Sequence, residues 1–135
     1  MGGAMAGAAY ETISTHLSNT KQSIHDFDMI LTGDLGKVGS GLMIDLFKRD
    51  EVDIANIHAD CGLMLYKIDE QDVHAGASGC GCSASVLCSF ILKRMTEGKL
   101  KNLLFTATGA LMSPTMLQQG ESIPSVAHAV HISME

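Results

Sequence analysis

Short apolar runs between helix-like segments constrain the fold of this chain most. Residues 28–32 and 102–108 are brief, mainly apolar stretches followed closely by glycine, which is typical of strands buried on both faces of a sheet. Residues 125–133 alternate apolar and polar side chains, and this alternation predicts a half-exposed strand. Strands that alternate with helices indicate an α/β fold, a mostly parallel sheet with helices on both faces.

Three helices are predicted between and before these strands. Residues 5–20 carry small apolar side chains at helical spacing, and residues 36–50 carry one apolar stripe on a solvent-facing helix. The stripe consists of Val38, Leu42, Met43, Leu46 and Phe47. A third helix is expected from Ser78 to about Glu97, with Gly98 as its stop signal. Within residues 52–73, the run 63–66 fits either a strand or part of a helix, and the pattern leaves both open.

Composition excludes several function classes. The chain has 135 residues, the length of one domain, with 46% hydrophobic and 18% charged residues. Its net charge is −6 and its basic residues are scattered, so nucleic acid is not an expected partner. No apolar run approaches the roughly 18 residues that a membrane span requires. The four cysteines lack the dense spacing of a disulfide scaffold, which favours a reducing compartment.

Three segments are expected at the carboxyl ends of strands, where α/β sheets bind ligands. They are residues 33–36, the turn before Ser78, and residues 108–110. Residues 74–85 combine glycines, hydroxyls and two thiols at an expected helix start, whose free N–H groups attract anions. The candidate ligand-binding residues are Gly33, Asp34, His74, Ser78, Gly79, Cys80, Thr108 and Gly109.

Structural roles compete with these binding roles. The glycines can serve only to bring a helix against the sheet. Asp34 is expected to cap the helix that begins at Gly36, and Ser78 is expected to cap the third predicted helix, which starts at Ser78. Asp and Ser are both favoured at helix N-caps. Binding and capping can coexist at either residue.

No metal site and no catalytic residue is predicted. Cys80 and Cys82 on a helix would point roughly 200° apart, which suits one tetrahedral zinc ion poorly even with His74 nearby. His128 and His131 are interpreted as ordinary strand residues facing opposite sides. Cys61 is interpreted as a small buried hydrophobe.

Four segments carry a resemblance to a known family. They are residues 28–36, 60–62, 75–84 and 107–124. On these segments the chain resembles the C-terminal half of thiolase-fold proteins and, among them, the stage V sporulation protein AD family. Because members of the family are longer, residues 1–135 are expected to form a C-terminal thiolase-like half-domain without the N-terminal half.

The resemblance implies a function in endospore formation. A protein of this family is expected to bind dipicolinic acid, or its calcium salt, for uptake into the developing spore. Its partners would be other stage V sporulation A proteins at the membrane. It would be cytoplasmic and peripheral to the forespore or spore inner membrane. No cofactor is expected, with calcium entering only together with dipicolinate.

The same resemblance makes acyl transfer an alternative rather than the expected activity. Catalytic relatives carry a histidine after the strand that matches residues 28–32, where this chain has Gly33 and Asp34. His74 resembles a second family histidine but stands one residue too close to the following Gly-Ala-Ser-Gly. A purely structural role as a dimerisation half also stays open. Since a half-fold exposes a sheet edge, a homodimer, a partner chain that carries the N-terminal half, or poor solubility is expected, with the homodimer as the first of these.

Overall fold

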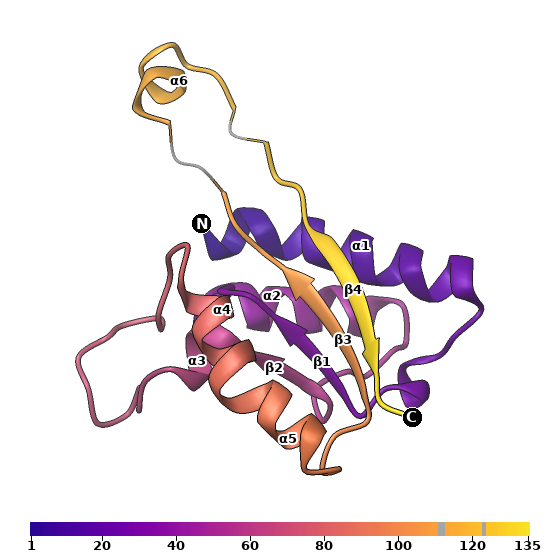
Figure 1. The fold of residues 1–135 in the computed structure, drawn as a ribbon. Helices are drawn as coiled ribbons and strands as arrows, with labels where there is room; N and C mark the ends of the chain where they lie inside the picture. Colours follow the sequence, from indigo (N-terminus) through magenta and orange to yellow (C-terminus); the bar gives the residue numbers. More distant parts are fainter. Residues whose placement is uncertain (111–112, 123) are drawn as a thin grey trace.

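The chain forms an α/β structure around one four-stranded sheet of order β2-β1-β3-β4 (Figure 1). The computed structural model describes residues 1–110, 113–122 and 124–135. The strands are β1 (Met29–Thr32), β2 (His58–Asp60), β3 (Asn102–Ala107) and β4 (His128–Ser133). β1 pairs in parallel with β2 and β3, whereas β4 pairs antiparallel with β3. The predicted mostly parallel sheet is therefore confirmed, with an antiparallel strand at one edge.

Helices cover both faces of the sheet, as predicted (Figure 1). One face carries α1 (Gly2–Thr20) and α2 (Gly36–Arg49). The other carries α3 (Cys61–Met64) and a continuous helical segment made of α4 (Cys82–Val86), one π-helical turn η2 (Leu87–Ile91) and α5 (Leu92–Thr96). A 3-10 turn, η1 (Ile24–Asp26), precedes β1, and α6 (Pro114–Gln118) lies in the long connection between β3 and β4.

The first core packs α1 and α2 against the sheet. Its fully buried members from these two helices include Ala9, Ile13 and Met43, which confirms the small apolar face predicted for residues 5–20. The two helices approach closely at Gly39, which has no side chain. A Cβ added there would lie only 2.7 Å from the Gly2 carbonyl oxygen. The buried residues of α2 are Gly36, Gly39, Ser40, Met43 and Phe47.

The stripe predicted for the second helix is therefore half wrong. Met43 and Phe47 are buried, but Val38 is 60% and Leu42 45% exposed. Val38 and Leu42 directly precede the buried residues Gly39 and Met43. One position along a helix is a rotation of about 100°, which turns both side chains away from the core. The helix is also less solvent-facing than predicted, since α1 packs along it.

The second core lies under the segment Cys82–Thr96. Val86, Ile91 and Met95 are buried there with Leu31 and Leu103 of the sheet. The five-residue step from Val86 to Ile91 matches the π-helical turn, in which hydrogen bonds join residues five apart. That turn shifts the apolar face and leaves Phe90 46% exposed.

The limits of this helical segment were predicted correctly at one end. Gly98 ends it at φ 70°, with its N–H donating to the Met95 carbonyl and the Lys99 N–H to the Arg94 carbonyl. The predicted start at Ser78 is wrong, because the helix begins at Cys82. Gly79 has φ 131°, which a helix cannot accommodate.

The segment left open by sequence reasoning contains β2 and α3. Residues 63–66 form neither a strand nor a piece of the next helix, since Leu63 and Met64 end the separate short helix α3 and α4 begins at Cys82. Among the described residues, no helix has the length and apolar character needed to cross a membrane. The fold as a whole is compatible with a thiolase-like half-domain.

Candidate functional site

The three segments predicted at strand ends meet around one cavity of about 560 Å³. β1 and β3 run in parallel (Figure 1), and Asp34 and Thr108, which follow these strands in the chain, therefore lie at the same edge of the sheet. Ser78 and Gly79, in the turn before α4, close the third side. The described lining residues are Met1, Asp34, Ser78, Gly79, Cys80, Ser83, Thr108, Gly109 and Ala110.

The carboxylate of Asp34 joins these segments. One oxygen, Oδ2, accepts hydrogen bonds from the Ser78 hydroxyl at 3.0 Å and from the Gly79 N–H at 3.2 Å. The other, Oδ1, accepts from the Thr108 hydroxyl at 3.2 Å, and that hydroxyl accepts from the Asp34 N–H at 2.8 Å. Asp34 is only 6% exposed. It therefore fixes the positions of Ser78, Gly79 and Thr108 around the cavity.

Both capping predictions at this site are wrong. Asp34 does not cap α2, because its side chain points across to Thr108 and the turn before α4. Ser78 caps no helix either, since α4 starts four positions later and the Ser78 hydroxyl donates to Asp34.

Asp60, which sequence reasoning missed, caps α2 instead. Its carboxylate accepts from the N–H groups of Leu35 at 2.8 Å and Gly36 at 3.0 Å, and from the Thr32 hydroxyl at 2.6 Å. The Asp60 side chain is nearly inaccessible, with 1% of the residue exposed. Because it holds the turn between β1 and α2, Asp60 also positions Asp34. The signal that could have predicted this cap is the position of Asp60 at the end of β2, the strand beside β1. Sequence reasoning did not predict β2, so the signal was missed.

Glycines bring the backbone of the site into direct contact. A Cβ at Gly33 would lie 2.9 Å from both the N and the Oγ1 of Thr108. A Cβ at Gly76 would lie 2.7 Å from the Gly62 carbonyl oxygen, which accepts the N–H of Ala77 at 2.8 Å. A Cβ at Gly79 or Gly81 would meet no atom within 4 Å. The predicted role of the glycines before the helix, to bring it against the sheet, is therefore not found at these two positions, and Gly76 contacts the start of α3 instead.

Seven of the eight candidate residues lie in or directly beside the cavity, and His74 does not. Gly33, although not a lining residue, contacts Thr108, and Cys80 is exposed at the rim. The His74 side chain is 88% exposed and its Nδ1 lies 3.5 Å from Asp72, in the loop that leads to the site. The structure therefore does not bring His74 to the other candidates.

The buried thiols of this region are not prepared for nucleophilic chemistry. Burial, with a smaller effect of Asp60, raises the pKa of Cys61 to about 12. Burial and the neighbouring Asp34 also raise the pKa of Cys82. Both residues belong to the second core, which confirms the interpretation of Cys61 as a buried hydrophobe. In the described ranges, no three His, Cys, Asp or Glu side chains gather as metal ligands.

His58 is expected to make the stability of the fold dependent on pH. The Thr32 hydroxyl donates to Asp60, so it accepts from the His58 Nε2 at 2.9 Å, which must carry the proton. Burial lowers the pKa of His58 below its usual 6.5.

Stability should consequently fall as the pH drops below the ordinary histidine pKa. The unfolded chain then binds a proton at His58 that the folded chain does not bind until lower pH, so the free energy of unfolding decreases. Urea unfolding of the wild type and of His58→Gln, at about pH 7.5 and about pH 5.5, measures this difference. The variant should show a smaller pH dependence, and an unchanged dependence would assign the effect to other groups.

The fold and the cavity define the class of protein to which the chain belongs. A mostly parallel sheet, helices on both faces and a cavity between strand-end turns are general features of α/β proteins, and they are compatible with a thiolase-like half-domain. The family model described as Stage V sporulation protein AD (SpoVAD) matches residues 1–133, and the chain belongs to this family of sporulation proteins.

A curated relative supports the same assignment. Stage V sporulation protein AD of Bacillus subtilis (strain 168) is 51% identical to the chain over 130 residues. The match covers 96% of this chain and 38% of that relative. The resemblance found in the sequence is therefore confirmed, and the chain spans well under half the length of this relative.

Proposed function

We propose that the chain binds dipicolinic acid as its calcium chelate, in the cavity around Asp34. The observation that carries this proposal is the charge of the cavity. Asp34 is the one charged side chain among its described lining residues, and neither lysine nor arginine lines it there. Free dipicolinate is a dianion that this carboxylate repels, whereas the chelate with one calcium ion is neutral.

The lining groups match the needs of such a chelate. Calcium takes 6–8 oxygen ligands, of which dipicolinate supplies only part. Asp34 and the hydroxyls of Ser78 and Thr108 keep acceptor lone pairs beyond the hydrogen bonds they make, and can supply more. The first turn of the helix from Cys82 reaches the cavity at Ser83. The Cys82 N–H donates to the Gly79 carbonyl, and the N–H groups of Ser83 and Ala84 are the ones that suit the outer carboxylate oxygens of the ligand.

Within the cell this binding would serve the uptake of dipicolinate into the developing spore. Membership of the sporulation family supports that role. The chain would work with other stage V sporulation A proteins at the forespore or spore inner membrane, on its cytoplasmic side. Calcium would enter with the ligand as part of the cargo.

Binding is favoured over acyl transfer by the chemistry of the described residues. The thiols of Cys61 and Cys82 have raised pKa values, and His74 lies away from the cavity. No described lining residue is a histidine that could act as a general base at neutral pH.

Neutralising Asp34 is expected to weaken the binding of calcium dipicolinate. Asp34→Asn keeps the size of the side chain and one acceptor oxygen but removes the charge that faces calcium. The dissociation constant should rise about tenfold or more. Asp45→Asn, at an exposed position of α2, removes the same charge away from the cavity and should leave binding unchanged. Calorimetric titration of both variants with calcium dipicolinate measures the two dissociation constants. Equal affinities for the two variants would contradict the assigned site.

We also propose that the chain forms a homodimer through β4. This strand pairs with β3 along one side and has no partner strand along the other among the described residues. Val126, which precedes the strand, is 57% exposed, and Val130, which lies in it, is 55% exposed. Open edges of this kind pair with other strands. Size-exclusion chromatography with light scattering should give the mass of a dimer, and a sharp monomer would contradict the proposal.

A further inference from the structure

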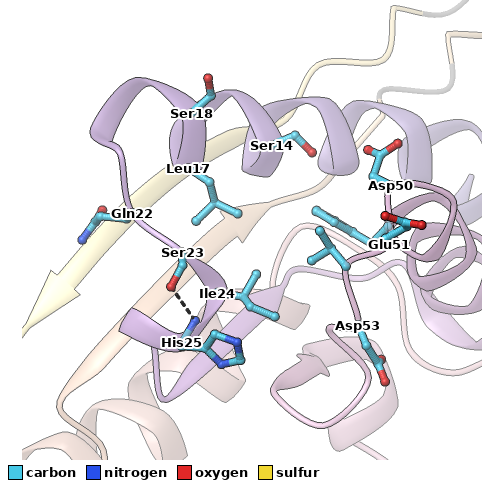
Figure 2. A pocket seen from close by; sticks show the side chains of 12 residues that line it. Ser14, Leu17, Ser18, Gln22, Ser23, Ile24, His25, Asp50, Glu51 and Asp53 are labelled. Atoms are coloured by element: carbon cyan, nitrogen blue, oxygen red, sulfur yellow. Dashed lines mark hydrogen bonds between the residues drawn. The ribbon is translucent and has the colours of Figure 1, made fainter.

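A second cavity, of about 570 Å³, lies at the other end of α2 from the Asp34 site. It is an open groove between the second half of α1, the η1 turn and the residues that follow α2. Figure 2 shows Leu17 from α1 and Ile24 from η1 pointing toward each other across it. Phe47 and Val52 complete an apolar floor. Phe47 is buried, and Leu17, Ile24 and Val52 are partly buried against the first core, so the floor is a narrow apolar surface at the bottom of the groove.

Three carboxylates form one side of this groove. Asp50, Glu51 and Asp53 gather at one side of it, and all three are exposed (Figure 2). They follow the C-terminal end of α2, whose carbonyl groups add partial negative charge to that of the side chains. No lysine or arginine lines the groove among the described residues.

The three carboxylates also lack a cationic partner within the described chain. Its ion pairs join Lys67 to Glu70, His74 to Asp72 and Lys99 to Glu97, all elsewhere. Asp50 accepts a hydrogen bond from the Tyr10 hydroxyl and Asp53 one from the Ala55 N–H, both neutral donors. Lys48 and Arg49 stand in the last turn of α2 and His25 lines the groove, but none of them forms an ion pair with these carboxylates. Carboxylates in no ion pair beside an apolar floor favour a ligand of the opposite charge with an apolar part.

We propose that this groove docks a segment of a partner protein that carries lysine or arginine next to apolar side chains. The apolar side chains would fill the floor between Leu17 and Ile24, and the cationic groups would pair with the three carboxylates. An anionic lipid surface does not fit, because the carboxylates repel it. A second copy of the chain would have to bring a lysine or arginine to the groove, and the test below distinguishes this occupant.

The position of the groove keeps this docking separate from ligand binding. Asp34 precedes the first turn of α2, whereas Asp50 follows its last turn. A partner held at the groove would therefore leave the Asp34 cavity open to its ligand. The two proposals can fail independently of each other.

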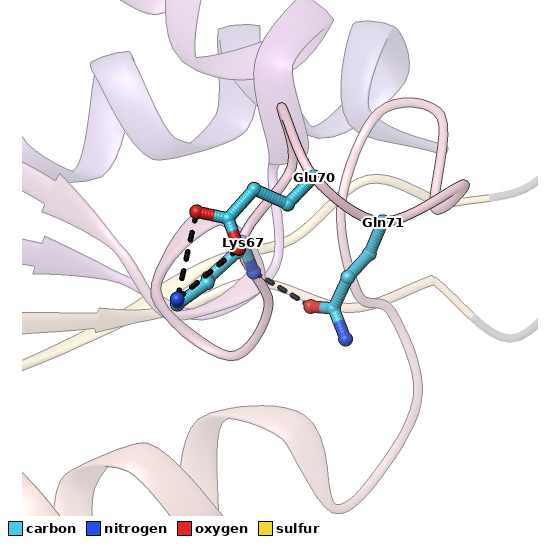
Figure 3. Close-up of polar contacts among 3 residues, drawn as sticks. All are labelled: Lys67, Glu70 and Gln71. Carbon is cyan, nitrogen blue, oxygen red and sulfur yellow. Dashed lines mark hydrogen bonds and ion pairs between the residues drawn. The ribbon is translucent and has the colours of Figure 1, made fainter.

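The test uses a neutralised groove and a matched neutralised surface. The variant Asp50→Asn, Glu51→Gln, Asp53→Asn removes three negative charges and keeps the acceptor oxygens that Tyr10 and Ala55 use. The control Asp69→Asn, Glu70→Gln, Asp72→Asn removes three charges from the exposed loop before the site. Figure 3 shows that the Glu70 carboxylate lies against Lys67, an exposed ion pair whose loss costs little.

The probe is a short acetylated, amidated peptide of alternating lysine and leucine, with a glutamate and leucine peptide as its counterpart. The lysine peptide should bind the wild type and shift amide NMR signals of the groove. Its affinity should fall about tenfold in the groove variant and stay near wild type in the control. Binding of calcium dipicolinate should be the same in all three proteins.

Three results would overturn the proposal. Equal losses in the groove and control variants would mean that the peptide responds to net charge alone. Equal binding of the glutamate peptide would show that the carboxylates select nothing. Self-association of the wild type that the groove variant loses would make a second copy the occupant.

Discussion

Replacing Asp60 with alanine should lower the free energy of unfolding by about 3 kcal/mol or more. The substitution leaves the N–H groups of Leu35 and Gly36 without their acceptor, in a place that water does not reach. The Thr32 hydroxyl loses its bond of 2.6 Å and keeps only the longer one of 3.4 Å to the Ala59 carbonyl. Each buried donor that loses its partner costs about 1–3 kcal/mol. Since the same bonds hold the turn that carries Asp34, the affinity for calcium dipicolinate should fall as well.

Asp28→Ala is the matched control for this variant. The Asp28 carboxylate also accepts from two backbone N–H groups, those of Lys101 at 2.8 Å and Asn102 at 2.9 Å. These bonds lower the pKa of Asp28, but the residue is exposed, so water can replace its carboxylate. Urea unfolding should show a much smaller loss for Asp28→Ala than for Asp60→Ala. Equal losses would mean that burial of the Asp60 hydrogen bonds is not what stabilises the turn.

Gly62→Ala is expected to cost about 3 kcal/mol through overpacking. An added Cβ would lie 2.4 Å from the Ala77 carbonyl oxygen and 2.9 Å from Oδ1 of Asp60. Both distances are shorter than real Cβ contacts, and the closer atom belongs to backbone that cannot rotate away. The start of α3 must then separate from the turn at Ala77, which carries Ser78 and Gly79 away from Asp34. Stability and ligand affinity should fall together.

Gly41→Ala serves as the control for that substitution. Gly41 lies in the exposed part of α2, and a Cβ there would meet no atom within 4 Å. Alanine should stabilise the helix by about 0.5–1 kcal/mol, because glycine loses more backbone entropy on folding. Thermal and urea unfolding of both variants measure the contrast. A neutral Gly62→Ala would show that the chain at Ala77 moves more freely than the contact implies.

The longer elements could be predicted from the sequence, and the shortest strand could not. The apolar runs around Ile30 and Leu104 are buried on both faces of the sheet, so their composition alone indicates strands. β2 has three residues, His58–Asp60, two of which are polar. It is a strand because β1 offers it hydrogen-bonding partners, such as Ile30 opposite His58, and no local pattern encodes such a pairing.

The location of the candidate site could be predicted, but the division of roles among its residues could not. Strand-end segments of a parallel sheet meet at one edge whatever their sequence, which brought Asp34 and Thr108 together as expected. Which carboxylate caps α2 depends on the strand beside β1. Asp34 stands nearer in the chain, yet Asp60 reaches the N–H groups of Leu35 and Gly36 from that neighbouring strand.

Calorimetric titration of the purified chain with dipicolinate tests the central proposal most directly. The titration is run with calcium, without calcium, and with acetyl coenzyme A as a comparison ligand. We expect saturable binding of the calcium chelate, weaker binding of calcium-free dipicolinate because Asp34 repels the dianion, and no response to the coenzyme. Binding of the coenzyme, or no binding of dipicolinate by the folded chain in either condition, would contradict the assignment of the cavity.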